Sequence, residues 1–444
     1  RSNELTLKAT YSTPQCGSPM TFTLHAENAS DQCVYALHSV LRYEGNYLNF
    51  DNPIYDTSFG RWGDIYTVDN EFEFTFYASG RYQMRFNMVD KSTIPHRSAM
   101  LRLDLVIEDA AYPTPEVRAD QMAQDCLAAG MRTDYEKALW LHDWLIDNCE
   151  YDNTYANTHA ASVFGKGIGT CEAYHQAYTM LLARVGVESR RSEDRTHGMH
   201  VWTAVKMDGS WYQVDTTWDD YKTNNRYPDE EHLYFGLTDE LIKKAHPGYT
   251  GPVPGYESTS LENNYFIKSR KITSYSDRYI LQIQKKIDAQ ESAFSIPAAA
   301  ENWPENYKEI IYNLVAYELS KTNWFLNGKK ISLAATYSNG QFAIKVNVPG
   351  EVIASVSQDQ MSVSIAAKNG WFSSASSVRF PVWSLVNGQD DLHWYQAAWR
   401  GSEWVATVPI SAHRSVGTYA VHAYATNSGR EANVGGTSFV IHHV

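Results

Sequence analysis

The sequence predicts an α+β protein of several domains, with β-rich modules at both ends of the chain. Residues 1–110 and 351–444 contain short runs in which apolar and polar residues alternate, the period of half-buried strands. Between them, apolar residues recur at three- and four-residue steps, which is the spacing of amphipathic helices. A length of 444 residues, at about 150 per domain, also corresponds to roughly three domains.

Composition limits the classes of partner that the chain can bind. A hydrophobic content of 43% and an aromatic content of 13% are typical of packed globular domains. The net charge of −13 argues against binding to nucleic acid or to an anionic membrane. No apolar run is long enough to span a bilayer. We therefore expect no nucleic-acid partner and no membrane span in this chain.

The first 110 residues are predicted to form an antiparallel, immunoglobulin-like β-sandwich. Alternating runs such as Met20–Leu24, Phe72–Phe76 and Leu101–Ile107 are separated by turn clusters such as Asn28–Gln32. No catalytic constellation is present in this module. Its expected role is that of a spacer or a binding domain.

A Pro-bearing linker at residues 111–115 leads into two predicted helices. The second opens with Thr133 and Glu136 in the spacing of a capping box. One face of this helix is apolar, and its members are Ala138, Leu141, Trp144, Leu145 and Cys149. His142 and Asp143 lie off this stripe and are predicted to face solvent.

A third helix is predicted to begin at Cys171, after the Gly-rich stretch that starts at Gly165. Apolar residues follow it at helical spacing, and Gly186 is placed to end the helix as a left-handed cap. At a helix N-terminus, the dipole and the free N–H groups favour a thiolate at Cys171. A lone cysteine at a helix end is, however, more often a buried structural thiol.

The next stretch is predicted to be a β-hairpin, with strands at residues 200–207 and 210–216 joined at Asp208-Gly209. A two-residue turn places Trp202 opposite Asp215. His200 shares the face of Trp202, so His200 and Asp215 become diagonal neighbours with Cβ atoms about 7 Å apart. Together with Cys171 they supply a nucleophile, a base and a group that orients the base.

These residues resemble the core of the transglutaminase-like superfamily, which has a papain-like cysteine fold. The resemblance rests on Gly169-Thr170-Cys171, His200-Val201-Trp202 and the run from Asp208 to Trp218. It is supported by the flanking stretches 133–152 and 233–246 and covers residues 115–270. The sequence departs from the family pattern at Ala173, His175 and Thr203, none of which belongs to the triad.

The resemblance implies roles for further residues. Cys171 would attack an amide carbonyl, and the oxyanion would be held by the Cys171 N–H together with one upstream donor, Tyr151 or Asn153. Trp202 and Trp218 are further candidates for the substrate or oxyanion site. No cofactor is expected. A zinc site built from His159, His175 and His197 is disfavoured, because no CxxC pair or further ligand stands at metal spacing.

Residues 258–275 are predicted to form a closing strand region. Residues 276–350 are predicted as helix, strand, helix and two strands, with a hairpin about Ser338-Asn-Gly. The predicted domains are therefore the β-sandwich at 1–110, the transglutaminase-like domain at 111–272, a small α/β appendage at 273–350 and a second β-sandwich at 351–444.

The last predicted domain resembles a Bsp-like repeat of the streptococcal type, a surface module. The resemblance is carried by Pro381–Ser384, Asn387–Tyr395 and Val421–Tyr424. It implies a cell-surface or extracellular protein of a Gram-positive-type bacterium. Most of the aromatic residues in this domain are expected to pack its core, and a face that binds cell-wall polysaccharide is a hypothesis.

Five cysteines suggest two disulfide bridges and one reactive thiol. The predicted bridges are Cys16–Cys33 and Cys126–Cys149, which leaves Cys171 unpaired. The alternative is five reduced thiols in a cytosolic chain.

We expect an exported cysteine enzyme that acts on amide bonds of peptides or proteins through a Cys171–His200–Asp215 triad and an acyl-enzyme. Hydrolysis is favoured, with cell-wall peptides as one candidate substrate class. The alternatives are a protein-cross-linking transglutaminase and a catalytically silent adhesion or wall-binding scaffold.

Overall fold

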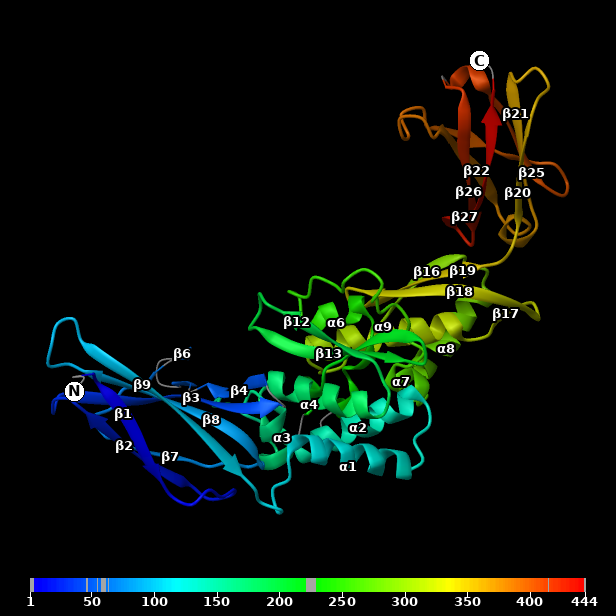
Figure 1. The fold of residues 1–444 in the computed structure, drawn as a ribbon. Helices are drawn as coiled ribbons and strands as arrows, with labels where there is room; N and C mark the ends of the chain where they lie inside the picture. Colours follow the sequence, from blue (N-terminus) through cyan, green and yellow to red (C-terminus); the bar gives the residue numbers. More distant parts are fainter. Residues whose placement is uncertain are drawn as a thin grey trace. The chain divides into compact units, whose positions relative to one another are not determined.

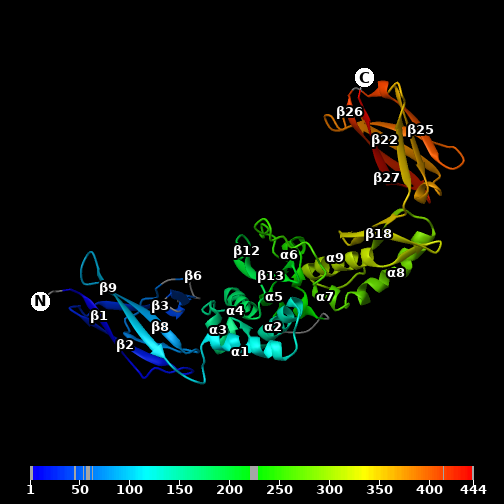
Figure 2. The ribbon, with the colours of Figure 1, turned by 45° about the vertical axis from the view of Figure 1, so that its right-hand side comes forward.

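The structure is a computed structural model that describes residues 4–44, 47–53, 55–56, 61–62, 64–220, 229–413 and 415–442. The chain divides into two compact units, residues 1–268 and 269–444. Figures 1 and 2 show the elements of each unit as ribbons. The four predicted domains, with their boundaries, stay a prediction.

The first unit begins with two antiparallel sheets that enclose one apolar core. Phe22 of one sheet and Met84 and Phe86 of the other are fully buried in that core. The three-stranded sheet consists of β1 (Thr6–Tyr11), β2 (Met20–Glu27) and β7 (Glu71–Phe74). The four-stranded sheet consists of β4 (Tyr47–Pro53), β3 (Cys33–Glu44), β8 (Gly80–Asp90) and β9 (Arg97–Ile107), in that order. A separate pair joins β5 (Tyr55–Asp56) to β6 (Arg61–Trp62). A two-layer sandwich is therefore present, and its immunoglobulin-like type stays a prediction.

The rest of the first unit sets a group of helices beside an antiparallel sheet (Figure 1). The main helices are α1 (Pro115–Ala128), α2 (Asp134–Asn148), α3 (Ala160–Lys166) and α4 (Cys171–Arg184). The sheet order is β12 (Ser189–Asp194), β13 (His200–Met207), β14 (Ser210–Val214) and β15 (Phe235–Leu237). Shorter elements are β10 (Glu150–Tyr151), β11 (Ile168–Gly169), α5 (Thr216–Asp219), η1 (Glu230–His232), α6 (Asp239–Ala245) and α7 (Tyr265–Lys268). Helix α4 contacts β13 as well as α1, α2 and α3, so it is the central helix of this group.

The apolar spacing of α4 explains its central place. Tyr174, Tyr178, Leu181 and Leu182 are fully buried. A helix that buries residues at these steps must be covered along most of its length. The helix ends as the sequence predicts, because Gly186 adopts φ +76° and the N–H of Val187 donates to the Leu182 carbonyl oxygen at 2.9 Å.

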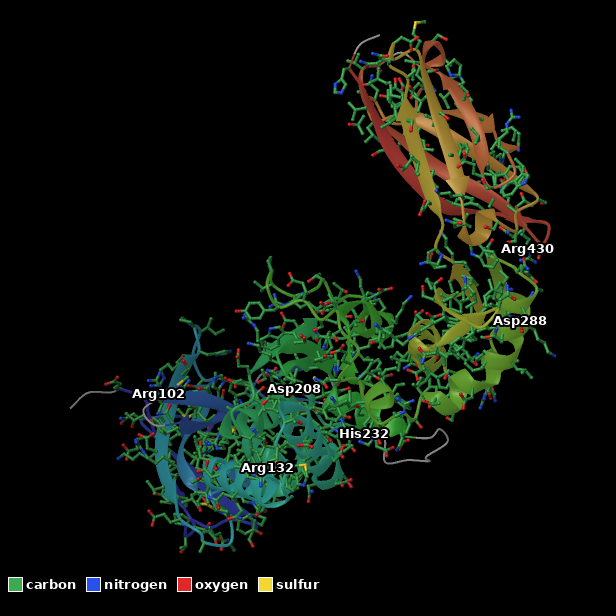
Figure 3. All side chains as sticks on the ribbon, turned by 90° about the vertical axis from the view of Figure 1, so that its right-hand side faces the viewer. Arg102, Arg132, Asp208, His232, Asp288 and Arg430 are labelled. Atoms are coloured by element: carbon green, nitrogen blue, oxygen red, sulfur yellow. The ribbon has the colours of Figure 1, made fainter. Side chains whose placement is uncertain are left out.

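The predicted hairpin is present as β13 and β14. Met207 pairs with Ser210, and the register continues to Thr203 opposite Val214. Asp208 and Gly209 have φ of +52° and +93°, as a two-residue turn with a left-handed backbone requires. The turn is tied to the start of α2, because the Asp134 N–H donates to Asp208 Oδ1 at 3.2 Å. Figure 3 labels Asp208 in this turn and Arg132, which lies just before α2 in the chain.

Three local predictions, two in α2 and one at residues 258–275, are confirmed or corrected by the structure. The capping box of Thr133 and Glu136 is present. His142 does not face solvent: its side chain is fully buried. The predicted closing strand at 258–275 is wrong, since the structure has loop, α7 and the start of the next helix there.

Contacts also join the N-terminal sandwich to the helices of the first unit. The Arg42 guanidinium donates to both carboxylate oxygens of Glu116, at 3.1 and 2.7 Å, in the first turn of α1. The Lys166 ammonium, at the end of α3, lies 5.0 Å from the ring centre of Tyr77. These contacts fix the sandwich against helices α1 and α3, which both precede Cys171 in the chain.

The second unit opens with the predicted helix, strand, helix and strands. They are α8 (Thr273–Asp288), β16 (Ala293–Pro297), α9 (Glu305–Lys321), β17 (Trp324–Leu326), β18 (Lys329–Ser338) and β19 (Gln341–Asn347). The sheet order is β16-β19-β18-β17. The short strand β17 was not predicted, and the hairpin about Asn339-Gly340 is present between β18 and β19.

The chain then forms a second two-layer β-structure, visible in Figure 2. One sheet consists of β20 (Glu351–Val356), β21 (Ser362–Lys368), β25 (Trp404–Pro409) and β24 (Ala398–Trp399). The other consists of β23 (His393–Gln396), β22 (Ser377–Ser384), β26 (Gly417–Asn427) and β27 (Arg430–Ile441). The short helical turns are η2 (Gly370–Phe372) and η3 (Ile410–Ala412). Both sheets contribute to one apolar core that includes Ile365, Phe380 and Tyr419.

Neither predicted disulfide bridge is present, because all five cysteines are free thiols. Cys16 pairs with Phe76, just before β8, while Cys33 pairs with Asp90 at the end of β8. An 11-residue strand spans about 33 Å, far beyond the roughly 7 Å that a disulfide allows between Cα atoms.

The second predicted bridge fails for the same kind of reason. Cys126 lies near the end of α1 and close to Lys137 in the first turns of α2, whereas Cys149 caps the far end of α2. A 15-residue helix is about 22 Å long. Both cysteines are instead fully buried apolar residues.

Thiol titration of the unfolded, unreduced protein is therefore expected to count five free thiols, since no pair is close enough to bridge. Intact mass measured before and after reduction provides the control and should not change. A count of one or three would contradict the structure and restore one or both bridges.

Among the described residues, no helix is both long and apolar enough to cross a membrane.

Candidate active site

Cys171 is the first residue of α4, and the chain reaches it through a short parallel strand pair. Strand β11 pairs with β10, so that Gly169 lies beside Tyr151. The N–H of Thr170, the N-cap, donates to the Asn157 carbonyl oxygen at 2.8 Å. Cys171 is half-buried, whereas the other four cysteines are buried. The one partly accessible thiol is therefore at a helix N-terminus, where the dipole stabilises negative charge.

His200 and Asp215 meet where the hairpin ends. His200 is the first residue of β13, and Asp215 is the residue after β14 and the N-cap of α5. The His200 Nε2 lies 2.7 Å from Asp215 Oδ2. The predicted diagonal neighbours are thus in direct contact. The backbone N–H of Trp218 donates to the other carboxylate oxygen at 3.1 Å.

Cys171 completes the group, because its sulfur lies close enough to the His200 ring to raise the pKa of that ring. Since Nε2 faces Asp215, the other ring nitrogen is the one available to the thiol. The structure therefore brings together all three residues of the predicted Cys171–His200–Asp215 triad.

The charges of the site favour an imidazolium. Burial alone would lower the pKa of His200, but the Asp215 charge and hydrogen bond, followed by Cys171, raise it to about 10. Burial alone would raise the pKa of Asp215, yet His200 and then His246 hold it well below its usual range. At neutral pH the site therefore contains His200 protonated beside an ionised Asp215.

The rate of peptide cleavage is expected to fall as pH rises through about 10, because His200 then loses its proton. A histidine whose pKa is higher in the folded than in the unfolded state stays charged below its folded pKa. It loses its charge, and with it its ion pairs, above that pKa. A pH–rate profile measured from pH 6 to 11 tests this expectation, with circular dichroism at each pH to show that the fold persists. A rate that still rises above pH 10 would contradict the assignment.

The two oxyanion candidates differ in position. Burial and then the neighbouring Cys171 raise the pKa of Tyr151, so its phenol stays protonated and is a potential hydrogen-bond donor close to the sulfur. Asn153 is exposed, and no contact places its side chain beside Cys171. Of the two predicted donors, the structure brings only Tyr151 to the site.

Trp202 and Trp218 both contact the His200 ring. Trp202 is buried, stacks on His200 at a ring-centre distance of 5.8 Å, and donates from Nε1 to Gln213 at 2.8 Å. Trp218 lies at 5.7 Å from the His200 ring and is 38% exposed. Trp202 therefore packs on the His200 ring from within, whereas part of the Trp218 ring is exposed.

His246 is a site residue that the sequence reasoning did not identify. It follows α6, and its Nε2 lies 2.8 Å from the same Asp215 oxygen that contacts His200. It ends the stretch 233–246 that resembles the family, but no spacing rule connects it to the hairpin. Only the folding of α6 over β14 brings it there.

A second buried network lies behind the hairpin. His142 Nε2 is 3.0 Å from Asp219 Oδ2, and His142 Nδ1 is 2.9 Å from Asp143 Oδ1. His232, labelled in Figure 3, also contacts Asp143, at 2.8 Å. Although burial opposes it, the two aspartates raise the pKa of His142 to about 9. Since Asp219 closes the turn that Asp215 opens, this network anchors the triad's Asp215.

Three groups of side chains in the described parts of the chain are close enough to hold a metal ion. They are His142, Asp143 and His232; His200, Asp215 and His246; and Asp229, Glu231 and His232. In the first two groups, hydrogen bonds between the members themselves explain why these side chains lie together. Of the histidines considered for zinc from the sequence, His175 bonds instead to the hydroxyl of Thr203, at 2.8 Å.

Comparisons with known proteins agree with this geometry. Residues 121–216 match the model of the transglutaminase-like superfamily, and this range contains Cys171, His200 and Asp215. Residues 353–439 match the model of the GBS Bsp-like repeat. The chain thus carries a transglutaminase-like domain followed by a Bsp-like repeat, and no curated protein matches it.

Similar solved structures include a polysaccharide deacetylase from Bacillus cereus (12% identity, 20% of this chain and 29% of that one, TM-score 0.19) and a TGase (13%, 38% and 49%, 0.23). A candidate cysteine protease from Cytophaga hutchinsonii is also similar (12%, 47% and 79%, 0.21). The chain spans less than half of the length of the first two structures. With TM-scores below 0.5, these likenesses carry no argument about fold or chemistry.

Proposed function

We propose that this protein is a cysteine enzyme that cleaves amide bonds of peptides or proteins. The observation that supports this most strongly is the arrangement of His200, which lies beside the half-buried thiol of Cys171 and bonds to the fully buried carboxylate of Asp215. A thiol, a base and an orienting carboxylate in this order are the parts that acyl transfer needs.

In the first step, the Cys171 thiolate attacks the carbonyl carbon of the substrate. The Cys171 backbone N–H and the Tyr151 phenol would hold the developing oxyanion. His200 then transfers its proton to the leaving nitrogen as the C–N bond breaks. The products of this step are a free amine and a thioester at Cys171.

In the second step, a water molecule attacks the thioester carbonyl. His200, now neutral, takes the proton from water, and the C–S bond breaks to release a carboxylic acid and restore the thiolate. A primary amine in place of water would give a new amide and hence cross-linking. We favour hydrolysis because the domain accompanies β-modules and a surface-type repeat, an architecture that suits a hydrolase of extracellular or cell-wall peptides.

We further propose that the chain acts at the cell surface of a Gram-positive-type bacterium. The Bsp-like repeat supports this placement, whereas the cysteines no longer do.

Two tryptophans of this domain, Trp394 and Trp399, are each 44% exposed. Trp394 is held by the ring of Tyr424 at 5.1 Å and by the Arg379 guanidinium at 4.2 Å, so it is a fixed aromatic surface for a wall polysaccharide. Cosedimentation with purified cell walls tests this, since Trp394→Ala should bind less.

The rival proposal is a silent scaffold that uses the same fold for adhesion. A buried histidine–aspartate pair alone does not separate the two proposals, because His142 and Asp219 form one as well. The half-buried thiol of Cys171 beside the His200 ring favours an active enzyme.

Mass spectrometry of reaction products decides among these functions. The protein is incubated with a panel of peptides and muropeptides, with and without a primary amine, and Cys171→Ser serves as the control. Hydrolysis predicts products that gain water and are absent with the variant. Amine-bearing products would establish transamidation, and no product with any substrate would favour the scaffold.

A further inference from the structure

The carboxylate of Asp215 has two hydrogen-bond donors besides the His200 ring of a three-residue site. Its Oδ2 accepts from His200 at 2.7 Å and from His246 Nε2 at 2.8 Å, while Oδ1 accepts from the Trp218 N–H at 3.1 Å. Asp215 is fully buried, so these protein donors replace water around its charge. Two histidines therefore share one oxygen of the carboxylate.

The ring of His246 is fixed from several sides. Trp202 stacks on it at a ring-centre distance of 4.5 Å and an angle of 25°, and Trp218 meets it edge-on at 4.3 Å. Its backbone N–H donates to the Ile242 carbonyl oxygen at 2.9 Å, and only 3% of the side chain is exposed. A ring held in this way can direct its N–H at one point only.

We propose that His246 is a positioning residue: its Nε2–H holds the Asp215 carboxylate in the orientation that aims the His200 ring at Cys171. This inference rests on the proposed function for its role in turnover. Without this donor, Oδ2 would keep only its bond to His200, and the buried charge would have one hydrogen bond fewer in place of water. The carboxylate would then be free to rotate, and His200 would lose its fixed partner.

The titratable groups around the His200–Asp215 pair come from several elements. They are His200 on β13, Cys171 on α4, Tyr151 on β10 and His246 after α6. Removing His246 leaves the first three in place, so its effect can be separated from theirs.

Two substitutions of His246 separate its hydrogen bond from its packing. His246→Phe keeps a flat ring between the two tryptophans but removes the donor. His246→Gln loses the ring but carries an amide nitrogen the same number of bonds from Cβ as Nε2. We expect kcat for a cleaved peptide to fall roughly ten- to hundredfold in the Phe variant, the range for one hydrogen bond to a charged group, with KM unchanged. The Gln variant should recover most of the loss.

The rate of alkylation of Cys171 by iodoacetamide is a second measurement, and it needs no substrate. At pH 7 it should be slower in His246→Phe than in wild type, because a His200 ring that is no longer fixed supports the Cys171 thiolate less well. The Gln variant should stay close to wild type. Thermal unfolding of each variant shows whether it is folded.

The outcomes are distinct. If folded His246→Phe alkylates and turns over like wild type, or if His246→Gln is as slow as His246→Phe, the positioning role is wrong. If the wild type cleaves no peptide, the proposed function fails, while the alkylation rates still decide the role of His246.

Discussion

Replacement of Cys171 by serine is expected to lower turnover by about 10⁴-fold or more, which leaves only background hydrolysis. The change replaces one atom at a half-buried position, so the fold should persist. The hydroxyl of serine does not ionise beside His200, and the nucleophile is lost although the binding site remains. Product formation measured by mass spectrometry over long incubation quantifies the loss.

Cys126→Ser is the matched control for this substitution. Cys126 is fully buried in α1, away from the site. Serine there should reduce the free energy of unfolding, because a buried hydroxyl is poorly satisfied, but should leave kcat nearly unchanged. Turnover that survives in Cys171→Ser and falls in Cys126→Ser would contradict the assignment of the nucleophile.

His200→Ala is expected to remove nearly as much activity as Cys171→Ser, whereas Asp215→Asn should leave more. The first variant deletes the proton carrier. The second keeps His200 but removes the charge that chiefly offsets the effect of burial on its pKa. A neutral side chain at this place leaves the imidazole mostly unprotonated at pH 7 and wrongly oriented, for a loss of roughly 10³- to 10⁴-fold.

Steady-state kinetics of both variants at pH 7 test this order. Thermal unfolding is the control, since Asp215 is fully buried and its replacement also weakens the fold. If Asp215→Asn retained full activity while folded, Asp215 would not be the group that orients His200.

Those parts of the site that depend on local geometry could be predicted from the sequence. The turn at Asp208-Gly209 fixes the register of the hairpin, and the register brings His200 to Asp215. The Gly-rich stretch and the apolar spacing that follows it likewise place Cys171 at the start of α4. In each case a few neighbouring residues determine the conformation, so the local sequence pattern is enough to predict it.

The parts that depend on distant segments could not be predicted. His246 reaches Asp215 only because α6 folds over the hairpin, and no periodicity records that contact. His142 lies off the apolar stripe of α2 yet is buried, because Asp219 from a later turn pairs with it. The cysteine pairs were inferred from their number, but strand and helix lengths keep both pairs far apart.

The activated thiol at Cys171 is the central claim, and its rate of alkylation tests that claim most directly. Intact-mass measurement at pH 7 with limiting iodoacetamide should show one modified cysteine in the folded protein, Cys171, reacting much faster than a free thiol such as glutathione. His200→Ala should remove this advantage. Equal rates in wild type, His200→Ala and glutathione would show that Cys171 is an ordinary thiol and would contradict the account.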